Sequence, residues 1–196
     1  MTQARGGCMK TKQWIRFVLA GMVLMLGCNG NDLTKSASPV ALIVSNTMTF
    51  SHIDVAGGTK CDQLWGTIQM QAIAKNSNSP VTTFNQVRIS RYQVSYQRTD
   101  GGKLVPAPYV RTLDMLLDVG GAATGGKFIV LSPDAFLQAP FAALYPNNGG
   151  VDPDTGRAFV QMDIIVEVFG QTLAGENVSG STRFPMDFCY NCNGCS

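Results

Sequence analysis

Apolar and polar residues alternate with a period of two in several short stretches of the chain. The clearest one covers residues 160–168, where apolar residues alternate with Gln161, Asp163 and other polar side chains. A period of two predicts a β-strand with one face in the core and the other in water. Such stretches predict about seven strands in all, at residues 40–50, 64–75, 87–96, 113–119, 127–131, 160–168 and 184–188.

The phase of this alternation slips once within the stretch 87–96. Apolar residues stand at odd positions up to Ile89 and at even positions from Tyr92 onward. One extra residue in a strand shifts the alternation in this way, because it moves every later side chain to the other face. The sequence therefore predicts a β-bulge near Ser90 and Arg91.

Turn-forming residues separate the predicted strands, for example at 100–102 and 174–177. Residues 132–134 indicate a helix N-cap followed by proline, but Pro140 limits the helical stretch behind them to one or two turns. We therefore expect an all-β fold, a single antiparallel β-sandwich of immunoglobulin-like or fibronectin type. A jelly roll or a small barrel is the alternative.

Ahead of the first strand, a basic segment leads into an apolar one. Three basic residues between positions 10 and 16 precede the apolar run 17–26, which ends at Gly27 and Cys28. This order predicts a secretory signal peptide over residues 1–27, for which Met9 would be a more typical start than Met1. The run is too short to span a bilayer, which takes about 20 apolar residues.

The end of this segment, Met25-Leu26-Gly27-Cys28, resembles the lipobox of bacterial lipoprotein signal peptides, where Leu is more usual at the Met25 position. The resemblance implies cleavage before Cys28, a diacylglyceryl group on its thiol and acylation, as with palmitate, of the new amino terminus. Several acyl chains together make a stable anchor. Asn29 replaces the Asp that retains enterobacterial lipoproteins in the inner membrane, which implies export to the outer membrane. The alternative is an ordinary cleaved signal.

The rest of the chain is expected to form a tether and one domain. Residues 28–39 are polar and lack periodicity, which is typical of a flexible linker. Residues 40–196 are the predicted β-sandwich domain with a cysteine-rich tail. The stretch 87–108, together with the closing cysteines, resembles small β-sandwich modules of uncharacterised bacterial lipoproteins, and that resemblance implies a fold but no activity.

Net charge argues against a nucleic-acid partner. The whole chain carries a formal charge of +2, with 15 basic and 13 acidic residues. Four of the basic residues precede Cys28, which leaves 11 against 13 in the predicted mature protein. A slightly acidic domain lacks the basic patch that binding to nucleic acid requires.

Four cysteines remain after Cys28, and the spacing of Cys189, Cys192 and Cys195 is C-x-x-C-x-x-C. An exported chain folds in an oxidising compartment, which favours disulfides over zinc, an iron–sulfur cluster or thiol redox chemistry. If seven strands alternate in direction, Cys61 and Cys189 fall at the same end of the domain. We therefore expect the pairs Cys61–Cys189 and Cys192–Cys195.

Two further motifs have simpler interpretations than the catalytic or metal-binding ones. Residues 152–156 (DPDTG) have a partial calcium-loop pattern, but Gly156 stands where a ligand is needed, and a hairpin turn is the preferred interpretation. His52 is near Asp54, but catalytic triads assemble from distant segments of a chain. We expect no catalytic residue, no metal and no cofactor.

Taken together, these patterns predict an outer-membrane lipoprotein that presents one binding or scaffolding module in the cell envelope and is not an enzyme. Its partner would be an envelope protein or an extracellular polymer, contacted through the loops at one end of the sandwich. The alternative is a metal-binding or thiol-redox module built on Cys61 and the closing cysteines.

Overall fold

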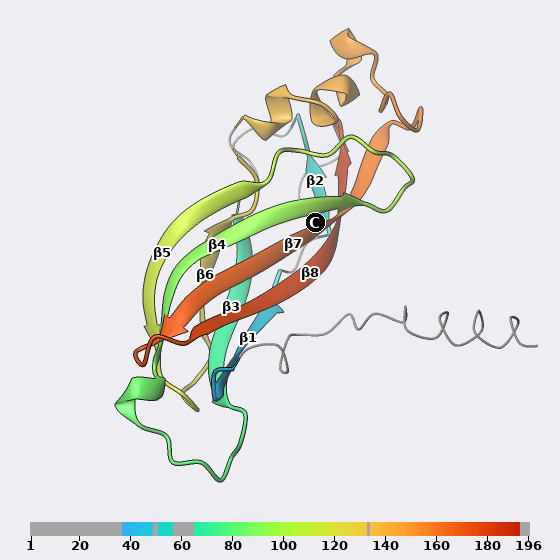
Figure 1. Cartoon of the computed structure of the whole chain (residues 1–196). Helices are drawn as coiled ribbons and strands as arrows, with labels where there is room; N and C mark the ends of the chain where they lie inside the picture. Colours follow the sequence, from blue (N-terminus) through green and yellow to red (C-terminus); the bar gives the residue numbers. More distant parts are fainter. Residues whose placement is uncertain (1–36, 49–50, 57–64, 133, 193–196) are drawn as a thin grey trace, which may run out of the picture. The chain divides into compact units, whose positions relative to one another are not determined.

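The computed structural model describes residues 37–48, 51–56, 65–132 and 134–192, all of which belong to one compact unit of the chain. Its strands are β1 (Val40–Asn46), β2 (His52–Asp54), β3 (Trp65–Ala74), β4 (Val87–Arg98), β5 (Tyr109–Leu117), β6 (Thr124–Ile129), β7 (Phe159–Thr172) and β8 (Asn177–Cys189) (Figure 1). Its helical turns are short 3-10 segments, η3 (Thr83–Asn85), η4 (Ala135–Leu137), η5 (Phe141–Leu144) and η6 (Pro146–Asn148). No helix in these ranges has the length and apolar character needed to cross a membrane.

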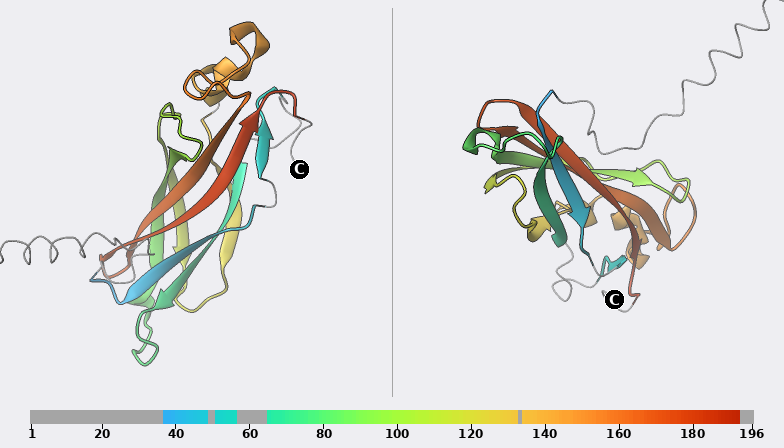
Figure 2. Two further views of the ribbon diagram at one scale, coloured as in Figure 1. Left: turned by 90° about the vertical axis from the view of Figure 1, so that its right-hand side faces the viewer. Right: turned by 90° about the horizontal axis from the view of Figure 1, so that it is seen from below.

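The strands form two sheets, seen as two layers in Figures 1 and 2. One has three strands in the order β1-β3-β6, and the other has five in the order β2-β8-β7-β4-β5. Neighbouring strands are antiparallel, except that β2 runs parallel to β8. The predicted all-β architecture with only short helical turns is confirmed. The short β2 was not predicted, because three residues are too few to show a period.

The predicted bulge in β4 is confirmed. Ile89 pairs with Gly170 and Arg91 pairs with Phe169, so two residues of β4 advance against one of β7. Ser90 and Arg91 are both exposed as a result. The bulge was visible in the sequence because the buried residues of β4 have odd numbers before it and even numbers after it.

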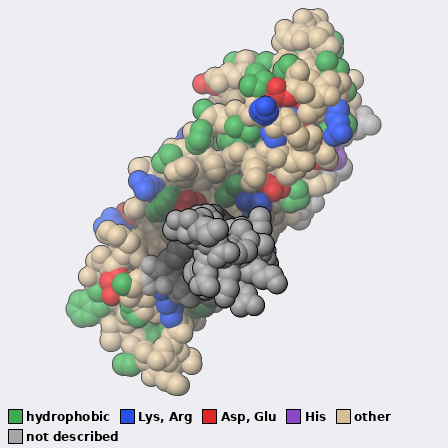
Figure 3. Space-filling view, turned by 45° about the vertical axis from the view of Figure 1, so that its right-hand side comes forward, with side chains coloured by type: hydrophobic (Ala, Val, Ile, Leu, Met, Phe, Trp, Pro, Cys, Tyr) green, Lys and Arg blue, Asp and Glu red, His purple; other side chains and the backbone are tan. Residues whose placement is uncertain are grey.

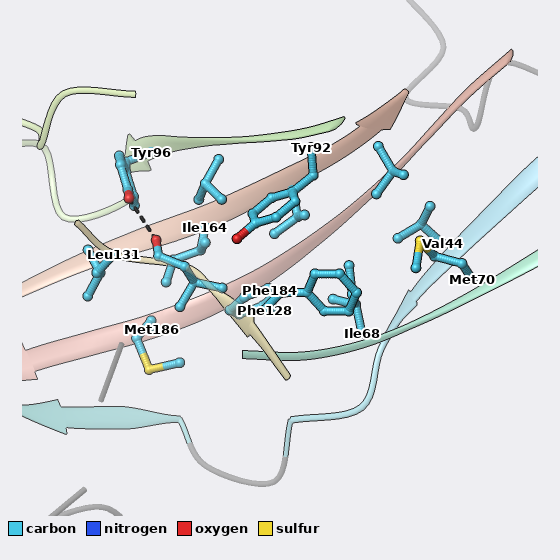
Figure 4. Packing of buried hydrophobic residues seen from close by; sticks show 14 of the residues in the cluster. Val44, Ile68, Met70, Tyr92, Tyr96, Phe128, Leu131, Ile164, Phe184 and Met186 are labelled. Carbon is cyan, nitrogen blue, oxygen red and sulfur yellow. Dashed lines mark hydrogen bonds between the residues drawn. The ribbon is translucent and has the colours of Figure 1, made fainter. Parts of the chain in front are cut away.

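A single core lies between the two sheets. The inward residues of β7 from Val160 to Val168 are fully buried, and side chains of β1 and β3 meet them from the opposite sheet. Figure 4 shows side chains from both layers pointing into this shared space. The larger members of the core are Leu42, Ile53, Ile68, Met70, Ile89, Tyr92, Tyr96, Leu117, Phe128, Leu131, Phe141, Leu144, Met162, Ile164, Phe184, Met186 and Phe188.

Two tyrosines of β4 cross the core and hold the opposite sheet. The hydroxyl of Tyr92 donates to the carbonyl of Ile129 at 3.1 Å. The hydroxyl of Tyr96 donates to the carbonyl of Val130 at 2.7 Å, a bond that Figure 4 shows as a dashed line. The ring of Tyr92 also meets Phe128 edge to face. Burial raises the pKa of both hydroxyls, so they stay neutral donors at physiological pH. The end of β6 is thereby attached to the five-stranded sheet.

Candidate functional site

The longest irregular segment that the structure describes, between β6 and β7, lies at the end of the domain where β8 finishes, together with the loop between β4 and β5. We call this end the loop pole: residues 99–108 between β4 and β5, residues 132–158 between β6 and β7, and residues 190–192 after β8 (Figure 1). At the other end lies the hairpin pole, formed by the β7–β8 turn at 173–176 and the β3–β4 connection at 75–86. Loops of this kind carry most binding residues in β-sheet domains.

A buried ion-pair cluster organises the loop pole. Arg98, the last residue of β4, donates to the carboxylate of Asp100 at 2.7 Å and to that of Asp152 at 2.8 Å. Its side chain is 2% exposed, and both carboxylates are fully buried. Burial alone would raise the pKa of each carboxyl. The hydrogen bonds that each carboxylate accepts from Arg98 and from nearby backbone or hydroxyl groups, together with the charge of Arg98, outweigh it, and the pKa of both is lowered. Both carboxylates therefore stay charged at neutral pH.

Asp154 joins the two long loops of the pole. Its carboxylate accepts from the backbone N–H groups of Lys103 and Leu104, at 2.6 and 2.8 Å. These two bonds lower the pKa of Asp154. Arg98 bonds to both loops, and Asp154 links the second loop to the backbone of the first. Residues 99–108 and 150–158 therefore form one connected structure.

The same contacts decide between the two interpretations of residues 152–156. The Oδ2 atom of Asp152 accepts from Arg98, from the hydroxyl of Thr155 and from its N–H group. Gly156 has a φ of 70°, in the left-handed region that favours glycine in a turn. Residues 152–156 therefore form a turn, closed by the N–H group of Gly156 donating to the carbonyl of Asp152 at 2.8 Å, although it does not join two paired strands as a hairpin would.

The described part of the C-terminal tail forms a small disulfide loop. Cys189 is bonded to Cys192, with 5.9 Å between their Cα atoms. The buried carboxylate of Asp54 accepts from the N–H groups of Asn191 at 2.8 Å and Cys192 at 3.1 Å. Asn191 has a φ of 53°, a conformation that asparagine tolerates better than most residues. Asp54 thus holds the loop against β2.

This bond corrects the predicted pairing. Cys189 bonds to Cys192, so the expected pairs Cys61–Cys189 and Cys192–Cys195 are wrong. The reason is local: a turn at Asn191 closes the C-x-x-C segment upon itself, and parity arguments cannot detect such a turn. Cys28, Cys61 and Cys195 lie outside the described residues.

Aromatic side chains fasten the helical turns to the end of β8. The ring of Phe141 in η5 lies 4.4 Å from that of Phe188, and both are fully buried. Tyr145 contacts Tyr190 edge to face, with ring centroids 5.2 Å apart. Its hydroxyl donates to the carbonyl of Val55 at 2.6 Å. The segment 135–148 is therefore packed against the tail although it contains no regular strand.

Apolar side chains reach solvent at this pole, as they also do at the hairpin pole and along β5. Leu137 in η4 is 76% exposed, more than any other large apolar side chain in the described ranges. Figure 3 shows one face of the molecule, on which charged side chains of both signs are scattered without a large cluster of one sign. The exposed apolar residues of the loop pole are Leu104, Val105, Leu137, Val151, Phe159 and Tyr190.

A second feature is an open groove on the outer face of the five-stranded sheet, near the hairpin pole. Its volume is about 660 Å³, and its lining includes Arg88, Asp114 and Leu173. Arg88 and Asp114 form an ion pair at 2.9 Å with side chains that are 63% and 73% exposed. An exposed pair contributes little to stability, so it can exchange with water or with a ligand.

Among the residues singled out in the sequence, Asp54 has a structural task in the disulfide loop, and His52 pairs with Asp187 in the β2–β8 ladder. The sequence did not identify Arg98 as buried, because its partner Asp152 lies 54 residues away along the chain. A DGG turn that begins two residues after this Arg was the available local signal. In the described ranges, no group of three or more His, Cys, Asp or Glu residues is arranged to hold a metal ion.

The chain matches no family model, no curated protein and no solved structure.

Proposed function

We propose that this chain is a lipoprotein anchored in the outer membrane through Cys28, and that it presents an immunoglobulin-like or fibronectin-type β-sandwich as a binding module. The order of residues 10–28 and the identity of Asn29 support the anchor and its destination. Two mainly antiparallel sheets on one core support a sandwich of this type. The module binds an envelope protein or an extracellular polymer, and it does not act as an enzyme.

The observation that carries the binding proposal is the combination of order and exposure at the loop pole. Contacts of the buried Arg98 and Asp54 and of the exposed Asp154 hold its loops, while apolar side chains such as Leu104 and Val151 reach solvent from them. Loops that are ordered before binding lose less conformational entropy on association. Exposed apolar and aromatic residues supply the contact area that drives it.

The position of β1 supports the loop pole as the surface that faces a partner. Val40, the first residue of β1, pairs with Ala74 at the end of β3, and the next residue, Lys75, donates to the carbonyl of Pro39. The domain therefore begins at the hairpin pole. A chain anchored by residues that precede β1 presents its opposite end, the loop pole, to the environment.

Photo-crosslinking in the bacterial envelope tests the binding surface. A photoreactive residue at Leu137 or Leu104 should give the same discrete adduct, because both positions project from the loop pole. The matched control is Phe84, which is 66% exposed but lies at the hairpin pole. Equal adducts from all three positions, or none from the loop pole, would refute the proposed surface.

The anchor has a separate test. The Cys28→Ala substitution should abolish labelling of the full chain by a fatty-acid analogue and release the protein from the membrane fraction. The control is Cys192→Ala, which removes a thiol of the disulfide loop and should leave acyl labelling intact. An acylated Cys28→Ala variant would contradict the proposal.

Thiol redox activity is the second candidate function, favoured by the disulfide between Cys189 and Cys192 in a C-x-x-C segment. A redox module would cycle this bond during its work. Alkylation of the protein inside cells, followed by mass spectrometry, separates the two candidates. A binding module keeps the pair oxidised throughout, whereas a redox module shows a reduced fraction that changes with the growth conditions.

A further inference from the structure

The open groove on the outer face of the five-stranded sheet lies apart from the loop pole, and the proposed function assigns it no role. Residues of the neighbouring strands β5, β4 and β7 line it, together with Leu173 and Gly175 of the β7–β8 turn (Figure 1). Its volume of about 660 Å³ falls within the usual range for small-molecule sites, about 300–1,000 Å³. The groove is therefore large enough to hold a ligand.

An irregularity in the strand pairing lies at this groove. Ser90 is the extra residue of β4 against β7, and on the other side of β4 two residues of β5, Leu113 and Asp114, face Ser90 together. β4 therefore leaves regular pairing on both of its sides at one point. Bulges re-aim side chains and are frequent beside active sites. All three of these residues line the groove.

The charges of the groove cancel. Arg88 binds Asp114 through two parallel hydrogen bonds, from Nε to Oδ1 at 2.9 Å and from Nη2 to Oδ2 at 3.0 Å. This pairing raises the pKa of Arg88 and lowers the pKa of Asp114, so both groups stay charged at neutral pH. The other described residues that line the groove are serine, threonine, glutamine, leucine and glycine, so the net formal charge of the lining is zero.

Neutral polar groups and an apolar surface complete the lining. The hydroxyl of Ser90 donates to a backbone carbonyl and can still accept, and the hydroxyl of Thr112 is exposed. The amide of Gln171 donates to Asn177, which leaves its carbonyl oxygen as an acceptor. Leu173, which is 48% exposed, supplies apolar area beside these groups. The groove thus combines donors, acceptors and apolar area without net charge.

This combination selects one class of ligand. A nucleotide, a phosphate or a metal ion would need a lining of opposite net charge, and a lipid chain would need a mainly apolar one. A neutral sugar has neighbouring hydroxyls, each of which can donate to a carboxylate or accept from a guanidinium. It also has C–H surfaces that pack on apolar side chains. The paired groups of Arg88 and Asp114 therefore match two adjacent hydroxyls of a sugar ring.

We propose that this groove binds a neutral saccharide, with adjacent sugar hydroxyls bonded to Arg88 and Asp114 and the ring face packed on Leu173. The side chains of the ion pair are 63% and 73% exposed, so both are accessible to a ligand. The hydroxyls of Ser90 and Thr112 supply further hydrogen bonds. The site is separate from the loop pole and does not depend on the lipid anchor, so it goes beyond the proposed function.

Isothermal titration calorimetry of the full chain, in micelles of a detergent without a sugar headgroup, tests the ligand class. The neutral probes are tetramers of glucose, mannose, galactose and N-acetylglucosamine. The charged probes are the tetramer of galacturonate, which is matched to the galactose tetramer, and inorganic phosphate. At least one neutral tetramer should bind saturably. The absence of saturable binding by every neutral tetramer overturns the proposal, and so does binding that is confined to the charged probes.

Substitutions in the groove test the place of binding. Arg88→Ala and Asp114→Ala should each raise the dissociation constant of that tetramer about tenfold, because each removes a charge-assisted hydrogen bond. The matched control is Arg183→Ala, which breaks another ion pair of the same sheet, with Asp163, outside the groove and should leave binding unchanged. The substituted side chains are all at least partly exposed, and circular dichroism checks that each variant keeps the native fold. Native affinity in both groove variants overturns the proposal, and so does an equal loss in the control.

Discussion

The guanidinium of Arg98 contacts the carboxylate of Asp152 at 2.8 Å in the interior of the loop pole, across 54 positions of sequence. Asp100 completes the cluster on the other side of the guanidinium, and a second oxygen of Asp100 accepts from the N–H group of Gln161 at the start of β7. One arginine thus connects the end of β4, the loop after it and the segment that leads into β7.

Removing one carboxylate from this cluster should destabilise the domain strongly. Asp152→Ala leaves a buried guanidinium with one partner fewer, and breaking a buried pair in this way costs about 3–5 kcal/mol. Chemical denaturation of the variant measures the change in the free energy of unfolding. The matched control is Asp114→Ala, which breaks the exposed pair with Arg88 and should have little effect. Equal effects of the two substitutions would contradict the central role of the cluster.

The same cluster predicts a dependence of stability on pH. The pKa of Asp100 and of Asp152 is lower in the folded state than the value of about 3.9 in an unfolded chain. The stabilisation they provide is therefore complete above the unfolded pKa and is lost as pH falls through the folded values. We expect the free energy of unfolding to decline from about pH 5 downward.

Urea denaturation at a series of pH values measures this dependence. In an Asp152→Asn variant, the decline below about pH 4 should be shallower, because one of the two depressed carboxyl groups is gone. An Asp163→Asn variant is a suitable control, since Asp163 belongs to a pair in which the partner Arg183 is 47% exposed. If the Asp152→Asn variant loses stability with the same slope as the native chain, the assignment is wrong.

Close contact between β1 and β8 predicts that replacing Gly180 by a larger residue destabilises the domain. A Cβ at this position would lie 2.3 Å from the carbonyl oxygen of Leu42, which is backbone and cannot rotate away. We expect Gly180→Ala to lower the free energy of unfolding by about 1–3 kcal/mol. Gly126→Ala is the control, because a Cβ there meets Phe128 at an ordinary 3.6 Å. Thermal unfolding of both variants should show a large loss of stability for Gly180→Ala and little change for Gly126→Ala.

The disulfide loop makes a prediction for chemical mapping. Proteolysis of the oxidised protein without reduction, followed by mass spectrometry, should yield a peptide in which Cys189 is linked to Cys192. Because the bond closes a loop of few residues, the Cys189→Ser/Cys192→Ser variant should lose little stability. A peptide that links Cys189 to Cys61 would overturn this assignment and restore the pairing predicted from strand parity.

Local pattern was sufficient for those features that depend on neighbouring residues. Alternation along residues 160–168 predicted the buried face of β7, and the slip at Ser90 and Arg91 predicted the bulge in β4. Both predictions succeed because successive side chains of a strand point to opposite faces. A strand with one buried face therefore has apolar residues at every second position. Proline and glycine likewise predicted the turn at residues 152–156 and the single helical turn η4 ahead of Pro140, whereas η3, η5 and η6 were not predicted.

Long-range pairing was decided by the tertiary structure. β2 has three residues and acquires its role only by lying parallel to β8, where Asp54 reaches the disulfide loop. In the sequence, Arg98 is a polar residue at the end of a strand. It becomes buried only because the loop that carries Asp152 covers it in the folded chain. The cysteine pairing was settled by the turn at Asn191. Periodicity encodes which face of a strand is buried, but the choice of partner depends on distant segments that meet only in the folded chain.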